Sequence, residues 1–183
     1  MGQPLKVIQI MFLNLSGNKK GISIIEILIV ITIIGFALVS VLGLASLSLK
    51  TSTSIKELTQ ANTLAQEVIE AIRNFRDGTE WDINGLKDYI ETGAATSDPY
   101  HPELDNNFDP PKWILVEGEE TIGDFTRKVV FKKVSRDSLT ANIEPTYNTD
   151  RDDYDTRKVE ATISWNNGNK KIELVTYFTN WKQ

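Results

Sequence analysis

The sequence predicts an α+β protein in which a long N-terminal helix, membrane-spanning in its first half, packs by its outer half against a C-terminal antiparallel β-sheet of three to four strands. Three observations predict this fold. An uncharged apolar run lies within the first 49 residues, a stripe of apolar side chains at helical spacing follows it, and residues 112–183 carry the alternating pattern of strands. The chain thus divides into an apolar helical part and a polar sheet-forming part.

The composition of the chain excludes several classes of function. Among its 183 residues there is no cysteine and one histidine, His101. Disulfides, thiolate metal sites and thiol nucleophiles are therefore excluded, and a multi-histidine site or a Ser–His pair has one residue to draw on. We expect neither an enzyme nor a cofactor. The net charge of −5 arises in the polar part, which argues against binding of nucleic acid phosphates.

Residues 22–49 are apolar enough to cross a membrane. Within them, residues 27–49 include no charged residue and no proline. As a helix this run spans about 34 Å, more than the ~30 Å hydrocarbon core of a bilayer. Because Lys19 and Lys20 precede it, the positive-inside rule places the N-terminus in the cytoplasm and the chain from Lys50 onward outside. A cleaved secretory signal fits poorly, since its apolar region has only about 7 to 15 residues.

One charged residue, Glu26, lies at the start of this apolar segment. An unpaired carboxylate at membrane depth costs about 2–4 kcal/mol. Either the side chain reaches the polar interface, or a cation on another molecule compensates its charge. The position of Glu26 alone leaves both options open.

The residues around Glu26 form a motif. The run KKGISIIE from Lys19 to Glu26, followed by an apolar run and Gly35, resembles the leader-cleavage signature of type IV pilins and pseudopilins. In that family a basic leader ends in glycine, an apolar residue becomes the new N-terminus, and glutamate is its fifth residue. Residues 62–77 (NTLAQEVIEAIRNFRD) also resemble the juxtamembrane helix of many minor pilins.

The resemblance implies a maturation pathway and an assembly mechanism. Prepilin peptidase would remove the basic leader, residues 1–21, by cutting between Gly21 and Ile22, and the new amine of Ile22 would be N-methylated. Glu26 would then pair with such an amine on a neighbouring subunit. The implied partners are other pilin or pseudopilin subunits, the peptidase/methyltransferase, the inner-membrane assembly platform and membrane lipid. The chain departs from the family in having Ile22 instead of Phe or Met, and in lacking the C-terminal disulfide of many pilins.

The resemblance predicts a minor pilin or pseudopilin. Such a protein is a structural subunit of a type IV pilus or type II secretion-like filament, held first in the cytoplasmic membrane by a single span and later in an extracellular filament. The alternative is an uncleaved, single-pass membrane-anchored extracellular binding or sensor module, which needs neither Gly21 nor Glu26. Major or minor status, the kind of filament, and a start at Met1 or Met11 all stay open.

Two glycines lie inside the apolar segment. Gly35 matches a glycine of the family's helix, and Gly43 stands where major pilins often have proline. Each glycine costs about 1 kcal/mol relative to alanine in a helix. The pair therefore predicts either a flexible stretch of helix or close packing against another helix.

An amphipathic continuation of the helix is predicted for residues 50–77. Its apolar positions recur at steps of three and four, at Ile55, Leu58, Ala61, Ala65, Val68, Ile72 and Phe75. The opposite face is expected to be solvated and carries Lys56, Glu57, Gln60, Gln66, Glu67 and Glu70. The pattern ends at Asp77-Gly78.

Glycine and proline recur through residues 78–111, which predicts a loop-rich connection with one short helix near residues 83–90. His101 lies here with no second His or Cys nearby, so a solvated loop residue is expected rather than a metal ligand.

The sheet domain is predicted for residues 112–183. Its strand candidates are residues 112–117, 125–134, 158–165 and 171–179. Alternation places Val129 and Phe131 on the inward face of the second strand. In the third strand it groups Val159, Ala161, Ile163 and Trp165. The residues NNGN that follow predict a hairpin, because Asn and Gly adopt positive φ at low cost.

Two further groups of side chains invite a binding hypothesis. Aspartates at alternate positions can converge on Ca²⁺, and four crowd one loop: Asp150, Asp152, Asp153 and Asp155. Because the glycine of an EF-hand loop is missing, we expect a solvated acidic loop and no metal, with calcium as the less favoured alternative. Aromatic side chains could form a platform for sugar or peptide, but we expect core and edge packing of Trp113, Trp165, Tyr177, Phe178 and Trp181.

Overall fold

The computed structural model describes residues 21, 23–90 and 94–181. A single α-helix, α1 (Ile24–Gly78), has 55 residues. The chain forms two compact units, residues 1–50 and residues 51–183. The first unit contains the apolar part of α1, and the second contains the remainder of α1 together with the sheet.

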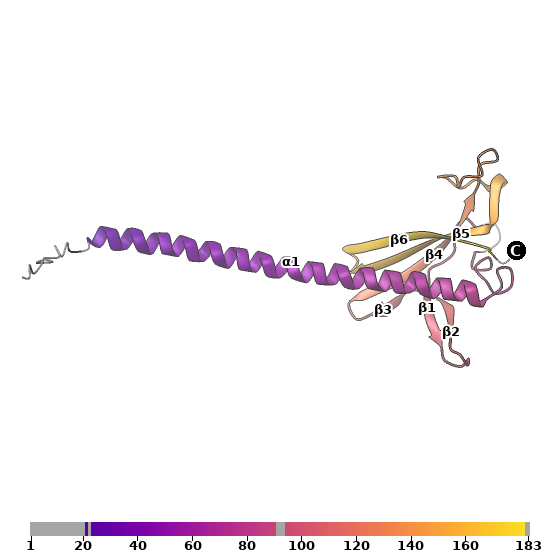
Figure 1. Cartoon of the computed structure of the whole chain (residues 1–183), viewed down its shortest axis with the longest axis horizontal. Coiled ribbons are helices and arrows are strands. Elements are labelled where there is room, and N and C mark those ends of the chain that lie inside the picture. The colour runs from indigo at the N-terminus through magenta and orange to yellow at the C-terminus, as the bar shows by residue number, and fades with distance from the viewer. Residues whose placement is uncertain (1–20, 22, 91–93, 182–183) are drawn as a thin grey trace, which may run out of the picture. The chain divides into compact units, whose positions relative to one another are not determined.

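Six antiparallel strands form one sheet in the second unit (Figure 1). They are β1 (Tyr100–Asp105), β2 (Lys112–Glu117), β3 (Glu120–Ile122), β4 (Phe125–Ser135), β5 (Asp152–Trp165) and β6 (Lys170–Thr179). The order across the sheet is β2-β1-β4-β5-β6, and β3 pairs with β4. A short 3₁₀ helix (Thr149–Arg151) precedes β5. The protein therefore has the predicted α+β fold, with six strands instead of three to four.

The core lies between α1 and one face of the sheet. The helix contributes the small side chains Ala61 and Ala65, followed by larger ones down to Phe75. The sheet contributes the predicted inward residues Val129, Phe131, Val159, Ala161, Ile163 and Trp165, each at most 7% exposed. The predicted alternation of β4 and β5 is thereby confirmed. Because alanines face the sheet at the start of the contact, the helix backbone can approach it closely.

The predicted apolar stripe is buried over only part of its length. Ala61 to Phe75 lie in the core, but Ile55 and Leu58 are exposed. The prediction of burial for these two residues is therefore wrong. Apolar periodicity identifies the face of a helix that can be buried, but it does not say where the opposing layer ends.

The hairpin between β5 and β6 follows the prediction. Asn166, Asn167 and Gly168 all have positive φ, and the amide of Asn169 donates to the carbonyl oxygen of Asn166 at 3.1 Å. Trp165 is thereby paired with Lys170. This turn brings the first residues of β6 beside the last residues of β5.

The connection predicted for residues 78–111 is more ordered than expected. Tyr100–Asp105 forms β1, so the sheet begins at residue 100 and not at 112. Pro102 argued against a strand, since proline has no N–H to donate. In the structure β1 pairs along its whole length with β2. It pairs with β4 only between Tyr100 and Val129, so Pro102 does not need to donate an amide hydrogen bond to β4.

The short helix predicted near residues 83–90 is absent, although all eight residues are described. They form turns, and Leu86 and Ile90 reach the core from them. Because these two residues are four positions apart, as on one face of a helix, their spacing suggested a helix that does not form. A Cβ at Gly85 would lie 2.0 Å from the carbonyl oxygen of Glu80, so the turn depends on glycine at this position.

Candidate functional site

The apolar part of α1 exposes its side chains throughout the first unit. Every residue from 23 to 50 is exposed, including the large apolar side chains between Ile24 and Leu49. Among the described residues, α1 is the one helix long and apolar enough to cross a membrane. This much exposed apolar surface is compatible with a single membrane span.

Two hydroxyl groups within this segment, those of Thr32 and Ser40, are satisfied by the helix itself. The hydroxyl of Thr32 donates to the carbonyl oxygen of Leu28 at 2.7 Å, and that of Ser40 donates to the carbonyl oxygen of Phe36 at 2.8 Å. Burial of these two residues in an apolar environment therefore leaves no hydroxyl donor unpaired.

Glu26 lies in the first turn of α1. Its amide donates to the carbonyl oxygen of Ser23 at 3.0 Å, and its carboxylate is exposed. A carboxylate in the first turn is favoured by the helix dipole. Gly21 is exposed and precedes the helix, whereas Ile22, Lys19 and Lys20 lie outside the described residues.

Gly35 and Gly43 meet nothing in the described part of the chain that requires glycine. Apart from the surrounding helix backbone, a Cβ at either position would have no described atom within 4 Å, and both residues are helical. Both predictions for them, flexibility and close packing against another helix, concern what surrounds this segment and stay predictions.

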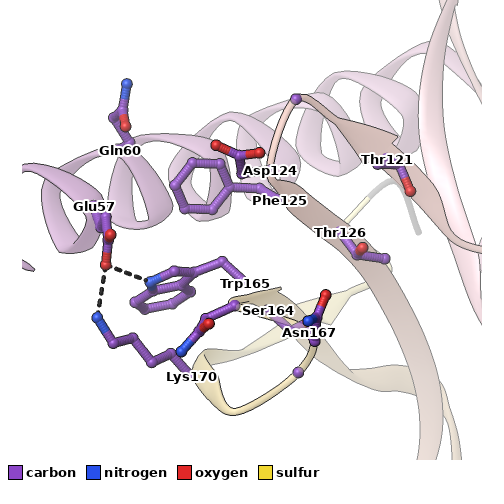
Figure 2. A pocket seen from close by; sticks show the side chains of 13 residues that line it. Glu57, Gln60, Thr121, Asp124, Phe125, Thr126, Ser164, Trp165, Asn167 and Lys170 are labelled. Carbon is purple, nitrogen blue, oxygen red and sulfur yellow. Dashed lines mark hydrogen bonds and ion pairs between the residues drawn. The ribbon is translucent and has the colours of Figure 1, made fainter.

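Two ion-pair groups fix α1 to the sheet in the second unit. Glu57 accepts hydrogen bonds from the indole Nε1 of Trp165 at 3.0 Å and from Nζ of Lys170 at 2.7 Å (Figure 2). Further along the helix, Arg127 of β4 donates to Glu67 at 3.0 Å and to Glu120 of β3. The predicted solvation is confirmed for Glu67, which is exposed, whereas Glu57 is partly buried; both carboxylates also have partners in the sheet.

The guanidinium of Arg127 is almost fully buried, with its side chain 6% exposed. It also donates to the carbonyl oxygen of Pro102 at 3.1 Å, so one side chain links α1, β1, β3 and β4. Strand alternation already placed Arg127 on the inward face with Val129. A cation on a buried face needs carboxylate partners. The position of Arg127 on that face therefore indicated that an acidic residue such as Glu67 would pair with it.

A cavity of about 690 Å³ lies beside the Glu57 group (Figure 2). Its lining combines α1 with the turns that follow β3 and β5, and includes Glu57, Gln60, Asp124, Phe125, Asn167 and Lys170. The carboxylate of Glu57 and the ammonium of Lys170 are already paired with each other. The cavity is therefore polar, and its charged groups hold the sheet to the helix.

Acid is expected to weaken the Glu57 contact. The hydrogen bonds from Lys170 and Trp165 lower the pKa of Glu57 below its usual 4.5. Its stabilising contribution is thus fully present above about pH 4.5 and is lost as the pH falls through the folded-state pKa. The urea midpoint of the wild-type protein, followed by tryptophan fluorescence, should fall more steeply between about pH 5 and pH 3 than that of Glu57→Gln.

The control for this experiment is Glu103→Gln, which removes an exposed carboxylate of β1. This variant should retain the wild-type slope. Equal slopes for the wild type and Glu57→Gln would contradict the assignment.

The predicted acidic loop is wrong, because Asp152, Asp153 and Asp155 lie in β5 and Asp150 in the 3₁₀ helix before it, and these three aspartates of β5 have separate partners. Asp153 accepts from Nε of Arg136, the amide side chain of Asn180 donates to Asp155, and Lys133 lies 3.9 Å from Asp152. Burial raises the pKa of Asp153, but hydrogen bonds from Thr156 and Arg136 outweigh it and lower the pKa. Within the described part of the chain, no group of three or more His, Cys, Asp or Glu is placed to hold a metal ion.

The aromatic residues divide between core and surface. Trp165 and Phe178 are buried, and Trp113 packs partly buried against the core, as predicted. Tyr177 and Trp181 are exposed, so the prediction of core packing fails for Tyr177 in β6 and for Trp181 beyond it. His101 is partly buried, with Nδ1 3.1 Å from the carbonyl oxygen of Gly118, and is therefore less solvated than expected.

Comparison of this chain with protein-family models, with curated proteins and with solved structures finds no match.

Proposed function

We propose that the protein is a minor pilin or pseudopilin, a structural subunit of a type IV pilus or type II secretion-like filament. Prepilin peptidase cuts it between Gly21 and Ile22, N-methylates Ile22, and leaves a subunit that the inner-membrane platform assembles through its N-terminal helix. The subunit is first a single-pass protein of the cytoplasmic membrane, with its sheet domain outside.

The observation that carries this proposal is the spacing of Gly21 and Glu26 immediately before an uncharged apolar run. A membrane anchor needs the apolar run but has no use for a glycine at the junction or a carboxylate five positions later. Both features are explained when the glycine marks a cleavage site and the carboxylate meets the amine that cleavage creates.

The exposed apolar helix supports the same proposal. Lipid can cover residues 23–50 before assembly, and the helices of other subunits can cover them afterwards. Because Thr32 and Ser40 satisfy their own hydroxyl groups, neither environment leaves these donors unpaired. The helix therefore suits both places that a pilin-like subunit occupies.

The N-terminal peptide tests the proposal directly. Mass spectrometry of membrane and sheared-filament fractions, from cells that express the full chain with its own peptidase, should find a peptide that begins at N-methylated Ile22. Gly21→Ala should instead retain the leader and accumulate as precursor in the membrane.

The matched control is Gly43→Ala, the same substitution within the helix, where the added Cβ meets no atom within 4 Å. This variant should be cut like the wild type. An intact leader on the wild-type protein in both fractions would refute the proposal and favour an uncleaved, membrane-anchored binding or sensor module.

A further inference from the structure

The β1–β2 hairpin and its loop, residues 100–117, form an arm whose base packs on the core through Leu115 and Tyr100 but which has few strand pairs with β4. Six residue pairs connect β1 with β2, but a single pair, Tyr100 with Val129, connects β1 with β4. Figure 1 shows this hairpin projecting from the rest of the sheet. We call residues 100–117 the β1–β2 arm.

The β1–β2 arm carries negative charge and exposed apolar side chains. Its four carboxylates, against the single cation Lys112, are Glu103, Asp105, Asp109 and Glu117. Leu104 and the loop residue Phe108 are 41% and 47% exposed. All of residues 106–111 are exposed, so the end of the arm meets no covering element of its own chain.

The outer face of β4, β5 and β6 has the opposite character. Strand register places Lys132, Lys158 and Tyr177 in one row across it, and Val130, Glu160 and Val175 in the next. We call this surface the lysine face, and define it by Lys128, Lys132, Lys158, Lys171, Val130, Val175 and Tyr177. Glu160 and Glu173 lie on it, and Glu119 pairs with Lys128 at 2.6 Å, so four lysines against three carboxylates leave it with a small net positive charge.

Glu160 lies at the centre of the lysine face and forms ion pairs with two of its lysines. Its carboxylate accepts from Lys158 at 2.8 Å and from Lys132. Burial raises the pKa of Glu160, but the hydrogen bonds from these two lysines outweigh it and lower the pKa. One carboxylate is thus shared by two ammonium groups, which retain donors for an incoming anion.

We propose that the β1–β2 arm of one copy of this chain docks on the lysine face of a second copy. The carboxylates of the arm meet the lysines, while Phe108 and Leu104 cover the apolar side chains Val130, Val175 and Tyr177. The arm belongs to the same sheet as the lysine face and lies to one side of it, so the occupant comes from another molecule. Because arm and face are different surfaces, each copy donates one contact and receives another, and the contact repeats without closing on itself.

This inference deepens the proposed function, on which it rests, for the case of a repeating pseudopilin subunit, by naming the surfaces that join neighbouring copies of this chain outside the helix. Charge complementarity sets the register and disfavours contacts between two arms or two faces.

Crosslinking of the full chain tests the contact. Because the chain has no cysteine, two introduced thiols are the only ones present. The double variant Phe108→Cys/Val175→Cys, treated with a short bismaleimide in sheared filaments, should give a ladder of dimers, trimers and larger species. The control variant Leu139→Cys/Val175→Cys uses a different loop residue, which is 93% exposed, and should remain mostly monomeric.

Charge reversal provides a second readout on the same ladder. Glu103→Lys and Lys132→Glu should each reduce crosslinking of the double-cysteine chain by roughly threefold, and their combination should recover most of it. The matched reversal Lys56→Glu, on an exposed residue of α1, should leave the ladder unchanged.

Three outcomes would overturn the inference: monomer alone, a product that stops at the dimer, or crosslinks only to a different protein. The N-terminal peptide of the same samples separates this failure from that of the proposed function. A chain that begins at Ile22 but gives no ladder refutes the arm contact alone. A chain with an intact leader refutes the proposed function.

Discussion

Glu26→Ala is expected to yield a subunit that is cut normally but is almost absent from filaments. The proposed cleavage residues Gly21 and Ile22 are unchanged, so maturation should proceed. The mature subunit then lacks the carboxylate that we propose to pair with a neighbour's terminal amine. Leaving one partner of a buried ion pair alone costs about 3–5 kcal/mol, which corresponds to a loss of two to three orders of magnitude in incorporation. The ratio of sheared-filament protein to membrane protein measures this loss.

Glu26→Gln separates charge from polarity in this experiment. If the ion pair is what matters, the glutamine variant should incorporate as poorly as the alanine variant. Glu70→Ala is the control, because it removes an exposed carboxylate of the outer helix that pairs only with Arg73. Wild-type incorporation of Glu26→Ala would contradict the pairing argument while leaving the cleavage site in place.

Phe131→Ala is expected to destabilise the helix–sheet unit by about 3–5 kcal/mol. Phe131 is fully buried in β4, and its ring centroid lies 5.7 Å from that of Tyr89 and 6.1 Å from that of Tyr100. Removing the ring opens a cavity where β4, β1 and the turn region after α1 meet. Urea unfolding of the full chain in detergent, followed through the buried tryptophans Trp81 and Trp165, measures the change.

The adjacent residue supplies the control. Val130 lies on the outer face of the same strand and is not buried, so Val130→Ala should cost less than about 1 kcal/mol. Similar losses for the two variants would mean that the sheet does not bury its helix-facing side, contrary to the fold described.

Local periodicity explains why much of the fold was predictable. Alternation in β4 and β5 identified Val129, Phe131 and Ile163 as inward, and the Asn-Gly turn after Trp165 fixed the last hairpin. Burial on one face imposes such a pattern wherever a strand crosses a core. β1 carries no such pattern, because Pro102 interrupts it and the strand is stabilised mainly by its partner β2. The strand β1 forms because it pairs with β2, and no local sequence pattern indicates this pairing.

The candidate functional residues also differ in whether the sequence alone could identify them. Gly21 and Glu26 stand out because each is unusual where it lies in the sequence. Glu57 and Glu67 do not, since a glutamate on the polar face of a helix looks the same whether it is solvated or reaches across to Trp165 or Arg127. The distinction requires knowing which strand lies beside which turn of α1. Pairing across long chain separations therefore limited the prediction of the site.

The long separation between α1 and its partners also governs how the protein folds. Glu57 precedes its hydrogen-bond partner Trp165 by 108 residues in the sequence. The buried part of the helix from Ala61 to Phe75 is thus synthesised first and has nothing to cover it until β4, β5 and β6 exist. Pairing at such high contact order is slow. During that interval the uncovered apolar face of the helix leaves the nascent chain open to proteolysis and aggregation, until Phe178 completes the core.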